Sequence, residues 1–133
     1  MTAAATHAAI KSHIEDLTFS PAIPIAWQNK DFVPDGNRFL KVTIIPAPVQ
    51  RLGVAVMHRR AGSVAITVAS RVNNGSGEGD GLADAVAAHF PADLKLTAGT
   101  KRLRITADPS IRDGFREAGY WHTPVVIPFE VLD

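Results

Sequence analysis

The sequence predicts an α+β fold: a mostly antiparallel sheet of about four strands, with two helices packed on one face and a long projecting hairpin. Two patterns lead to this fold class. Apolar and polar residues alternate in four segments, whereas in two others the apolar residues recur at the 3.6-residue spacing of a helix. The segments follow one another as helix, two strands, helix and two strands, without internal repeats. We therefore expect a single domain over residues 1–133.

The first element is a helix over residues 3–17. Its apolar stripe falls at helical spacing and consists of Ala3, His7, Ile10, Ile14 and Leu17. Alanines bind weakly through their small side chains, so we expect Ile10, Ile14 and Leu17 to anchor this helix. Two prolines and a Pro-Asp-Gly sequence follow within residues 19–36, which indicates an extended connector that ends in a turn.

Residues 39–45 and 63–69 are predicted strands, because every second residue in each is a large apolar one. The residues between them are too many for an ordinary hairpin loop. Val54 and Val56 also continue the alternation of the second strand. We therefore predict one long strand, or strand pair, whose arm at about residues 47–61 projects beyond the domain.

Glycines alternate strictly from Gly75 to Gly81, just before a predicted helix over residues 80–91 with Asp80 as its N-cap. A strand that enters a helix through glycines is the layout of a phosphate-binding loop and also of an ordinary connector. The spacing fits neither G-x-G-x-x-G nor a P-loop, and Glu78 and Asp80 would repel a phosphate. We interpret the segment as a mobile connector. A small nucleotide- or ligand-binding domain that uses Gly75–Gly81 remains an alternative.

The C-terminal part contains two further predicted strands, over residues 102–107 and 123–132, separated by a loop with three aromatic residues. Val125, Ile127, Phe129 and Val131 of the last strand share one parity and should face the core. Pro124 and Pro128 share the other parity and remove two hydrogen-bond donors from one side. We therefore predict that the last strand is an edge of the sheet.

The composition is that of an ordinary soluble domain, with 46% hydrophobic and 20% charged residues and a net charge of +1. This charge gives no reason to expect a nucleic-acid partner for the molecule as a whole. The absence of cysteine excludes disulfides and cysteine-bound zinc. No apolar run could span a membrane, and the first residues lack the features of a signal peptide. We expect no membrane partner and synthesis in a cytoplasm.

No pattern of residues indicates catalysis. The five histidines are too irregularly spaced for a local metal motif, the serines lack a nucleophile elbow, and the carboxylates lie near predicted loops or solvent faces. We therefore predict no enzymatic activity, no catalytic residue, no metal site and no cofactor. The histidines are His7, His13, His58, His89 and His122.

Two groups of residues are candidate contacts for assembly. The predicted arm carries Arg51, His58, Arg59 and Arg60, which can meet phosphates or an acidic protein surface, or form an ordinary solvated loop tip. In a ring of several copies these residues would form a positive annulus. The aromatic loop carries Phe115, Tyr120 and Trp121, and exposed aromatic residues often anchor protein interfaces.

The order of several short motifs resembles the tail terminator, or tail-completion and minor tail protein, family of long-tailed phages and prophages. These motifs span about residues 18–131, none is catalytic, and the helix at residues 3–17 lies outside them. In order they are PIAWQNKDFVPDG, the strand FLKVTIIP, the basic segment MHRRAGSVAITV, the glycine-rich loop, a helix that ends in Ala-x-x-Phe at Ala87–Phe90, and WHTPVVIPFEV.

The resemblance implies a structural role in the virion. Such a protein would form a ring, expected to be hexameric, on the head-proximal end of the tail tube. There it would end tube polymerisation and offer a joining surface. The implied partners are further copies of the chain, the tail tube protein and the head–tail connector, with DNA passing through the ring, and synthesis would take place in the cytoplasm of the bacterial host. Another head–tail connector or a tube protein, which share related folds, is the alternative within this class.

Overall fold

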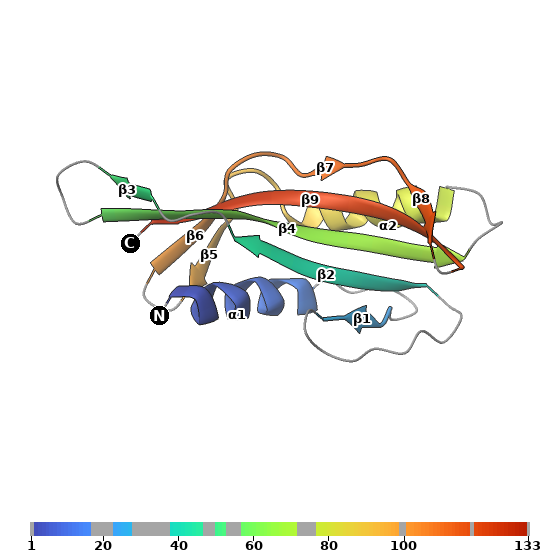
Figure 1. The fold of residues 1–133 in the computed structure, drawn as a ribbon, viewed down its shortest axis with the longest axis horizontal. Coiled ribbons are helices and arrows are strands. Elements are labelled where there is room, and N and C mark those ends of the chain that lie inside the picture. Colours follow the sequence, from blue (N-terminus) through green and yellow to red (C-terminus); the bar gives the residue numbers. More distant parts are fainter. Residues whose placement is uncertain are drawn as a thin grey trace.

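The architecture is a long, curled sheet with two helices (Figure 1). The computed structural model describes residues 2–16, 23–27, 38–46, 50–52, 57–71, 77–98, 101–117 and 119–132. None of the described helices is long and apolar enough to cross a membrane. The elements are α1 (Thr2–Glu15), β1 (Ile25–Ala26), β2 (Phe39–Pro46), β3 (Gln50–Leu52), β4 (Met57–Arg71), α2 (Gly77–His89), β5 (Lys95–Ala98), β6 (Lys101–Ile105), β7 (Ser110–Ile111), β8 (Phe115–Glu117) and β9 (Tyr120–Leu132).

The α+β class is confirmed, but the prediction of about four strands is wrong. Among the described residues, nine strands form one sheet in the order β1-β2-β4-β9-β6-β5, with β3 beside β4 and both β7 and β8 beside β9. The sheet is mixed because β1 runs parallel to β2, while the other pairs are antiparallel. Apart from β3, which belongs to the predicted hairpin, the strands that the sequence did not predict have two to four residues. That is at or below the shortest run in which alternation identifies a strand.

The core lies on one face of the sheet and receives side chains from both helices. Val64 of β4 lies opposite Ile127 of β9, and Ile66 lies opposite Val125, so their side chains share that face. All four are at most 1% exposed. They form one cluster with apolar residues of β2, β6, α1 and α2. The cluster includes Ile10, Ile14, Leu40, Val42, Leu82, Val86, Phe90, Leu103, Ile105, Phe129 and Val131.

A pair of histidines joins the C-terminal ends of the two helices. Nε2 of His13 in α1 lies 2.6 Å from the carbonyl oxygen of His89 in α2, and Nε2 of His89 lies 2.6 Å from that of His13. The two rings stack with centroids 4.0 Å apart, and Phe90 packs edge-on against both. Each imidazole thus donates to a carbonyl near a helix end, where carbonyls lack helical partners. Ile10 and Ile14 are buried as predicted, whereas His7 is exposed and Leu17 lies outside the described residues.

The alternating glycines lie largely within α2, which corrects two predictions. The helix begins at Gly77, so Gly79 and Gly81 belong to it and Asp80 is not its N-cap; Gly75 lies outside the described residues. Gly79 is buried, and a Cβ there would lie 2.9 Å from Oγ1 of Thr123 and 3.3 Å from Oγ of Ser70. The glycine lets the first turn of α2 approach β4 and β9 closely. This packing role replaces the interpretation of Gly77–Gly81 as a mobile connector.

The pairing of β3 with β4 forms the predicted hairpin. Gln50, Arg51 and Leu52 lie opposite Arg59, His58 and Met57, respectively. Because β2 also pairs with β4, the two strands β2 and β3 follow one side of this 15-residue strand in succession. Figure 1 places the hairpin at one end of the long axis, beyond both helices. Val54 and Val56 lie outside the described residues.

The prediction that the last strand is a sheet edge is wrong, because β9 lies between β4 and β6. Its second side is covered in three short pieces, β6, β7 and β8. The carbonyls of Pro128 and Pro124 accept hydrogen bonds on this side from the N–H groups of Thr106 (3.1 Å) and Arg112 (2.8 Å). Pro128 lies in the gap between β6 and β7, and Pro124 lies between β7 and β8. The missing donors therefore coincide with breaks in the pairing rather than with an open edge.

Candidate assembly surfaces

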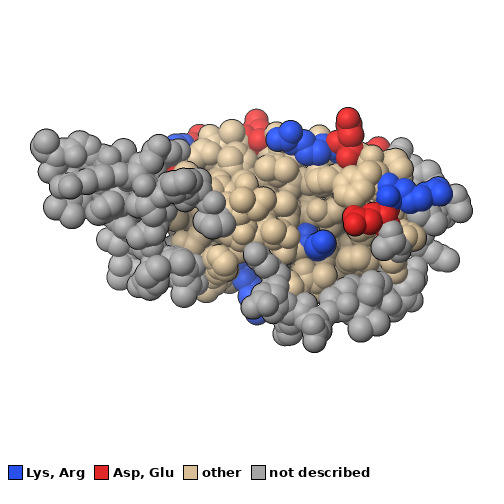
Figure 2. Space-filling view, in the orientation of Figure 1, with Lys and Arg blue, Asp and Glu red and all other residues tan. Residues whose placement is uncertain are grey.

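One face of the sheet, opposite α2, is largely uncharged. Figure 2 shows this face, with tan surface across its middle and charges of both signs along one margin. Most side chains of β4 and β9 on this face are small or apolar, and Lys41 of β2 is an exposed cation on it. Besides Lys41, strands β5 and β6 carry a cluster of cations, and α2 carries two exposed carboxylates.

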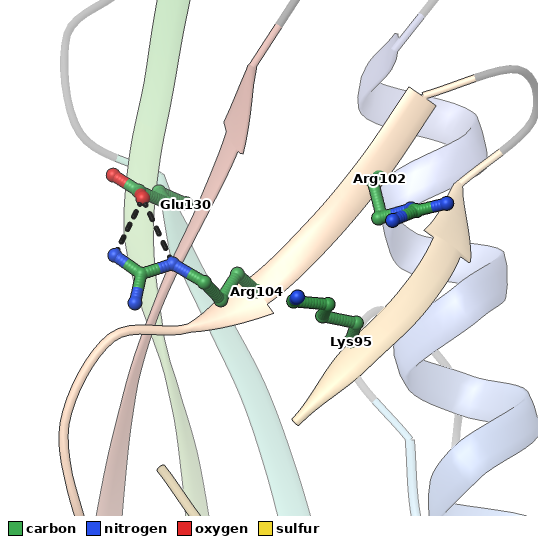
Figure 3. Close-up of a pocket in the computed structure, with 4 residues that line it drawn as sticks. All are labelled: Lys95, Arg102, Arg104 and Glu130. Carbon is green, nitrogen blue, oxygen red and sulfur yellow. Dashed lines mark hydrogen bonds and ion pairs between the residues drawn. The ribbon is translucent and has the colours of Figure 1, made fainter. Parts of the chain in front are cut away.

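Two carboxylates hold Arg104 of β6 in place, and Figure 3 shows one of them, Glu130. Its Nη2 lies 2.9 Å and its Nε 3.2 Å from Oε1 of Glu130, and its Nη1 lies 2.7 Å from Oδ1 of Asp93. The hydrogen bond with Glu130, followed by that with Asp93, raises the pKa of the Arg104 guanidinium above its ordinary value. A raised folded-state pKa matters only above the unfolded value, at strongly alkaline pH. Arg104 therefore keeps its charge at every pH at which the protein would work.

The backbone around Asp93 and Glu130 explains why these carboxylates reach Arg104. Glu130 lies directly opposite Arg104 in the β6–β9 ladder. Asp93 adopts a φ of 68°, in the left-handed region that aspartate tolerates, and its N–H donates to the carbonyl of Ile105 at 2.8 Å. The turn between α2 and β5 is thus tied to the end of β6.

Lys95 and Arg102 flank Arg104 and complete a basic pocket of 210 Å³, together with Glu130. Lys95 lies opposite Arg104 on β5, and Arg102 lies two residues away on the same face of β6 (Figure 3). Both side chains are exposed. Among the residues that the structure describes, no carboxylate forms a salt bridge with either one. We call Lys95, Arg102 and Arg104 the basic face.

The predicted basic arm reaches the same end of the molecule as this basic face. Arg51 and His58 are cross-strand partners in the hairpin. Arg59 lies opposite Leu132 of β9, which in turn lies opposite Arg102 of β6. Backbone pairing thus aligns the base of the arm on β4 with β6, two strands away in the sheet. The arm and the strands β5 and β6 together contain half of the chain's 14 lysines and arginines: Arg51, Arg59, Arg60, Lys95, Lys101, Arg102 and Arg104.

The three predicted aromatic contacts differ in accessibility. Tyr120 is only 9% exposed and packs edge-on against Phe39 on the face away from the main core. Trp121 is half-buried, with Gly79 beside its ring; its ring also fills the space where a Cβ at Gly114 would lie, 2.6 Å away. Phe115 is 43% exposed and stacks on the ring of His122. Phe115 is therefore the aromatic residue of the three that is most available to a partner.

The exposed side of α2 carries two acidic residues, Asp80 and Asp84. Asp80 and Asp84 are exposed, one helical turn apart, and the basic residue of this helix, His89, lies in its last turn. Asp80, near the first turn, also interacts favourably with the helix dipole. Neither aspartate forms a salt bridge with another residue that the structure describes. We call Asp80 and Asp84 the acidic patch.

Among the residues that the structure describes, the histidines and carboxylates do not gather into a reactive site. Within the described part of the chain, no group of three or more histidine, aspartate or glutamate side chains could hold a metal ion. His13 and His89 bond to backbone carbonyls, and Nε2 of His122 lies 3.1 Å from the carbonyl of Glu117. What the described residues do offer is charged, apolar and aromatic surface, which suits binding to other proteins.

Sequence patterns alone did not identify the basic pocket. Alternation in RLRI placed Arg102 and Arg104 on the outward side of a strand, but their partners depend on register. Lys95 belongs to a strand of four residues that was not predicted. The sequence feature that came closest to revealing the pocket was the pair Arg102 and Arg104 on either side of Leu103, which indicates that one face of this strand is charged.

Comparisons with known proteins identify the fold and the family of this chain. No curated protein matches the sequence. A solved structure of another protein superimposes with a TM-score of 0.83 at 23% sequence identity, and the match covers 98% of this chain and 96% of that chain. At this identity the likeness shows a shared fold. The sequence model of the family described as phage tail terminator protein matches residues 5–129, nearly the whole chain. The chain therefore belongs to the phage tail terminator family, a family of structural proteins of the phage tail.

Proposed function

We propose that this protein closes the phage tail tube as a ring of six copies. In this role it ends polymerisation of the tube and presents the surface on which the head-side connector docks. The observation that carries the proposal is the family match over residues 5–129. The proposed partners are further copies of the chain, the tail tube protein and the head–tail connector, and DNA would pass through the lumen.

The shape and surfaces of the subunit suit this role. A closed ring needs two unlike surfaces on each subunit, because every copy contacts its neighbours head to tail. The β4–β9 ladder runs from the Arg59–Leu132 pair to the Arg71–Tyr120 pair, about 40 Å at ~3.3 Å per residue. The hairpin lies at the first end, and the start of α2 packs near the second. Each end can therefore meet a different partner.

We further propose that Arg59 and Arg60 of the hairpin face the lumen or the tail tube. Reversing both charges with Arg59→Glu and Arg60→Glu should leave the protein folded and yield tails that fail to join heads. Circular dichroism of the purified variant checks folding, and electron micrographs of particles complemented with it check joining. Tails that join normally would refute this placement of the arm.

Mass and shape in solution test the ring itself. Sedimentation velocity should detect a species near six times the subunit mass of 14.2 kDa, about 85 kDa, and negative-stain images should show a sixfold ring. A strict monomer, both in solution and on purified tail tubes, would contradict the proposal. Labelling at the middle or the distal end of the tail would favour another tail role, and stabilisation by nucleotides would favour the ligand-binding alternative.

A further inference from the structure

The basic face and the acidic patch lie on different parts of the subunit. Arg102 is in register with Leu132, at one end of the β4–β9 ladder. Gly79, next to Asp80, packs against Thr123 near the other end. Leu132 and Thr123 are nine residues apart on β9, which corresponds to about 30 Å. Asp84 lies one helical turn beyond Asp80, about 6 Å along α2. At physiological ionic strength the Debye length is about 8 Å, so charges at the two ends of the ladder are largely screened from each other. Among the described residues, neither aspartate forms a salt bridge with the basic face.

Within the basic face, Lys95 and Arg102 are the residues open to a partner. Glu130 and Asp93 already bind Arg104, so its guanidinium lines the pocket as a charge that is already paired. Lys95 and Arg102 are diagonal neighbours on paired strands, and two exposed cations in this arrangement repel each other. A carboxylate between them would relieve this repulsion. The pocket volume of 210 Å³ is enough for such a side chain. The ligand that fits this chemistry is an acidic side chain on a protein surface.

We propose that this acidic surface is the acidic patch of α2 on a second copy of the chain. In the resulting contact, Lys95 and Arg102 of one subunit bind Asp80 and Asp84 of the next. The complementary charges lie on different surfaces of the same subunit, which is the arrangement that a head-to-tail contact requires. The inference deepens the proposed ring function and depends on it. The inference names the residues that join neighbouring subunits, and it predicts that ring assembly weakens as the salt concentration rises.

Paired charge reversals test the contact. Variant one carries Lys95→Glu and Arg102→Glu, and variant two carries Asp80→Lys and Asp84→Lys. Each variant alone should lose self-association at least tenfold, whereas a one-to-one mixture should assemble into rings in which the two variants alternate. In the mixture every contact again joins opposite charges, and a ring of six accommodates strict alternation. Native mass spectrometry at low salt measures the composition of the rings.

Two control variants distinguish the effect of the local charges on assembly from effects of net charge or loss of folding. Lys41→Glu with Arg112→Glu changes the net charge by as much as variant one but alters exposed residues outside the basic face, and should assemble like the wild type. Lysines at the start of α2 oppose the helix dipole, so Asp80→Asn with Asp84→Asn serves as a milder second form of variant two. It should weaken association several-fold and remain folded by circular dichroism.

The outcomes separate this inference from the ring proposal. Wild-type rings that persist in both charge-reversal variants would overturn the contact and leave the ring function standing. Loss of assembly in both variants without recovery in the mixture would also overturn it. A wild-type chain that stays monomeric, both at millimolar concentration and on tail tubes, would overturn the contact and the ring together.

Discussion

Because α2 approaches the sheet closely at Gly79, the structure predicts whether replacing a glycine of this helix by alanine stabilises or destabilises the protein. Replacing a helical glycine by alanine normally stabilises a protein by about 0.5–1 kcal/mol, because the unfolded chain loses freedom. Gly81→Ala should show this gain, since a Cβ at Gly81 has no atom within 4 Å. At Gly79 the new Cβ would lie 2.9 Å from Oγ1 of the buried Thr123, so the Thr123 side chain, the helix or the strand must shift.

The expected cost at Gly79 follows from the size of this overlap. Overpacking by one carbon in a tight core costs about 1–3 kcal/mol, which exceeds the helical gain. Gly79→Ala should therefore lower the free energy of unfolding by about 0.5–2 kcal/mol, whereas Gly81→Ala should raise it. Urea unfolding followed by far-UV circular dichroism measures both, with linear extrapolation to water.

A second substitution, at Thr123, tests whether its Oγ1 causes the loss of stability in Gly79→Ala. In a Thr123→Ala background Oγ1 is gone, and Gly79→Ala should lose its penalty. In a Thr123→Val background a methyl group replaces the hydroxyl, and the penalty should persist. If Gly79→Ala stabilises the wild-type protein as much as Gly81→Ala does, the first turn of α2 is not seated against β4 and β9 as described, and the reasoning fails.

Two further predictions concern the helix ends and the aromatic residues. His13→Ala and His89→Ala should each cost about 1 kcal/mol or more, with a coupling energy of about 0.5–2 kcal/mol in a double-mutant cycle measured by urea unfolding; additive effects would contradict the paired hydrogen bonds. Phe115→Ala should change the free energy of unfolding by less than about 1 kcal/mol yet weaken ring formation in sedimentation experiments, whereas Tyr120→Ala should cost about 3 kcal/mol. Equal stability losses would show that Phe115 is as buried as Tyr120.

The sequence identified the long elements of the fold and missed the short ones, for a physical reason. The strands β2, β4, β6 and β9 have five or more residues, so period-two alternation marks them. Shorter strands such as β1 and β7 exist because they pair with a long neighbour, and local sequence carries little of that information.

Glycine and proline were harder to interpret, because their effects depend on what lies beside them. The reasoning that Pro124 and Pro128 remove donors from one side of β9 holds, yet β6, β7 and β8 cover that side, with breaks in the pairing near the prolines. The glycines before Leu82 were interpreted as a loop, whereas Gly79 serves close packing inside a helix. Both outcomes depend on tertiary neighbours that periodicity does not report.

The candidate surfaces likewise divide into one that the sequence predicted and one that depends on tertiary structure. The basic arm was found from sequence, because charged residues between two predicted strands need no tertiary information. The pocket at Arg104 was not found, because its partners come from three separate segments, and register alone decides that Glu130 faces it. Burial separates the aromatic residues, since Phe115 is exposed and Tyr120 is not.

The length distribution of tails in particles made without this protein tests the central claim most directly. Electron micrographs of lysates from a phage genome with the gene disrupted would measure tail length and head attachment, with wild-type complementation as the control. A protein that ends tube polymerisation predicts tails of irregular, extended length that are not joined to heads, and complementation should restore a single length. Tails of normal length joined to heads in the absence of the protein would contradict this role.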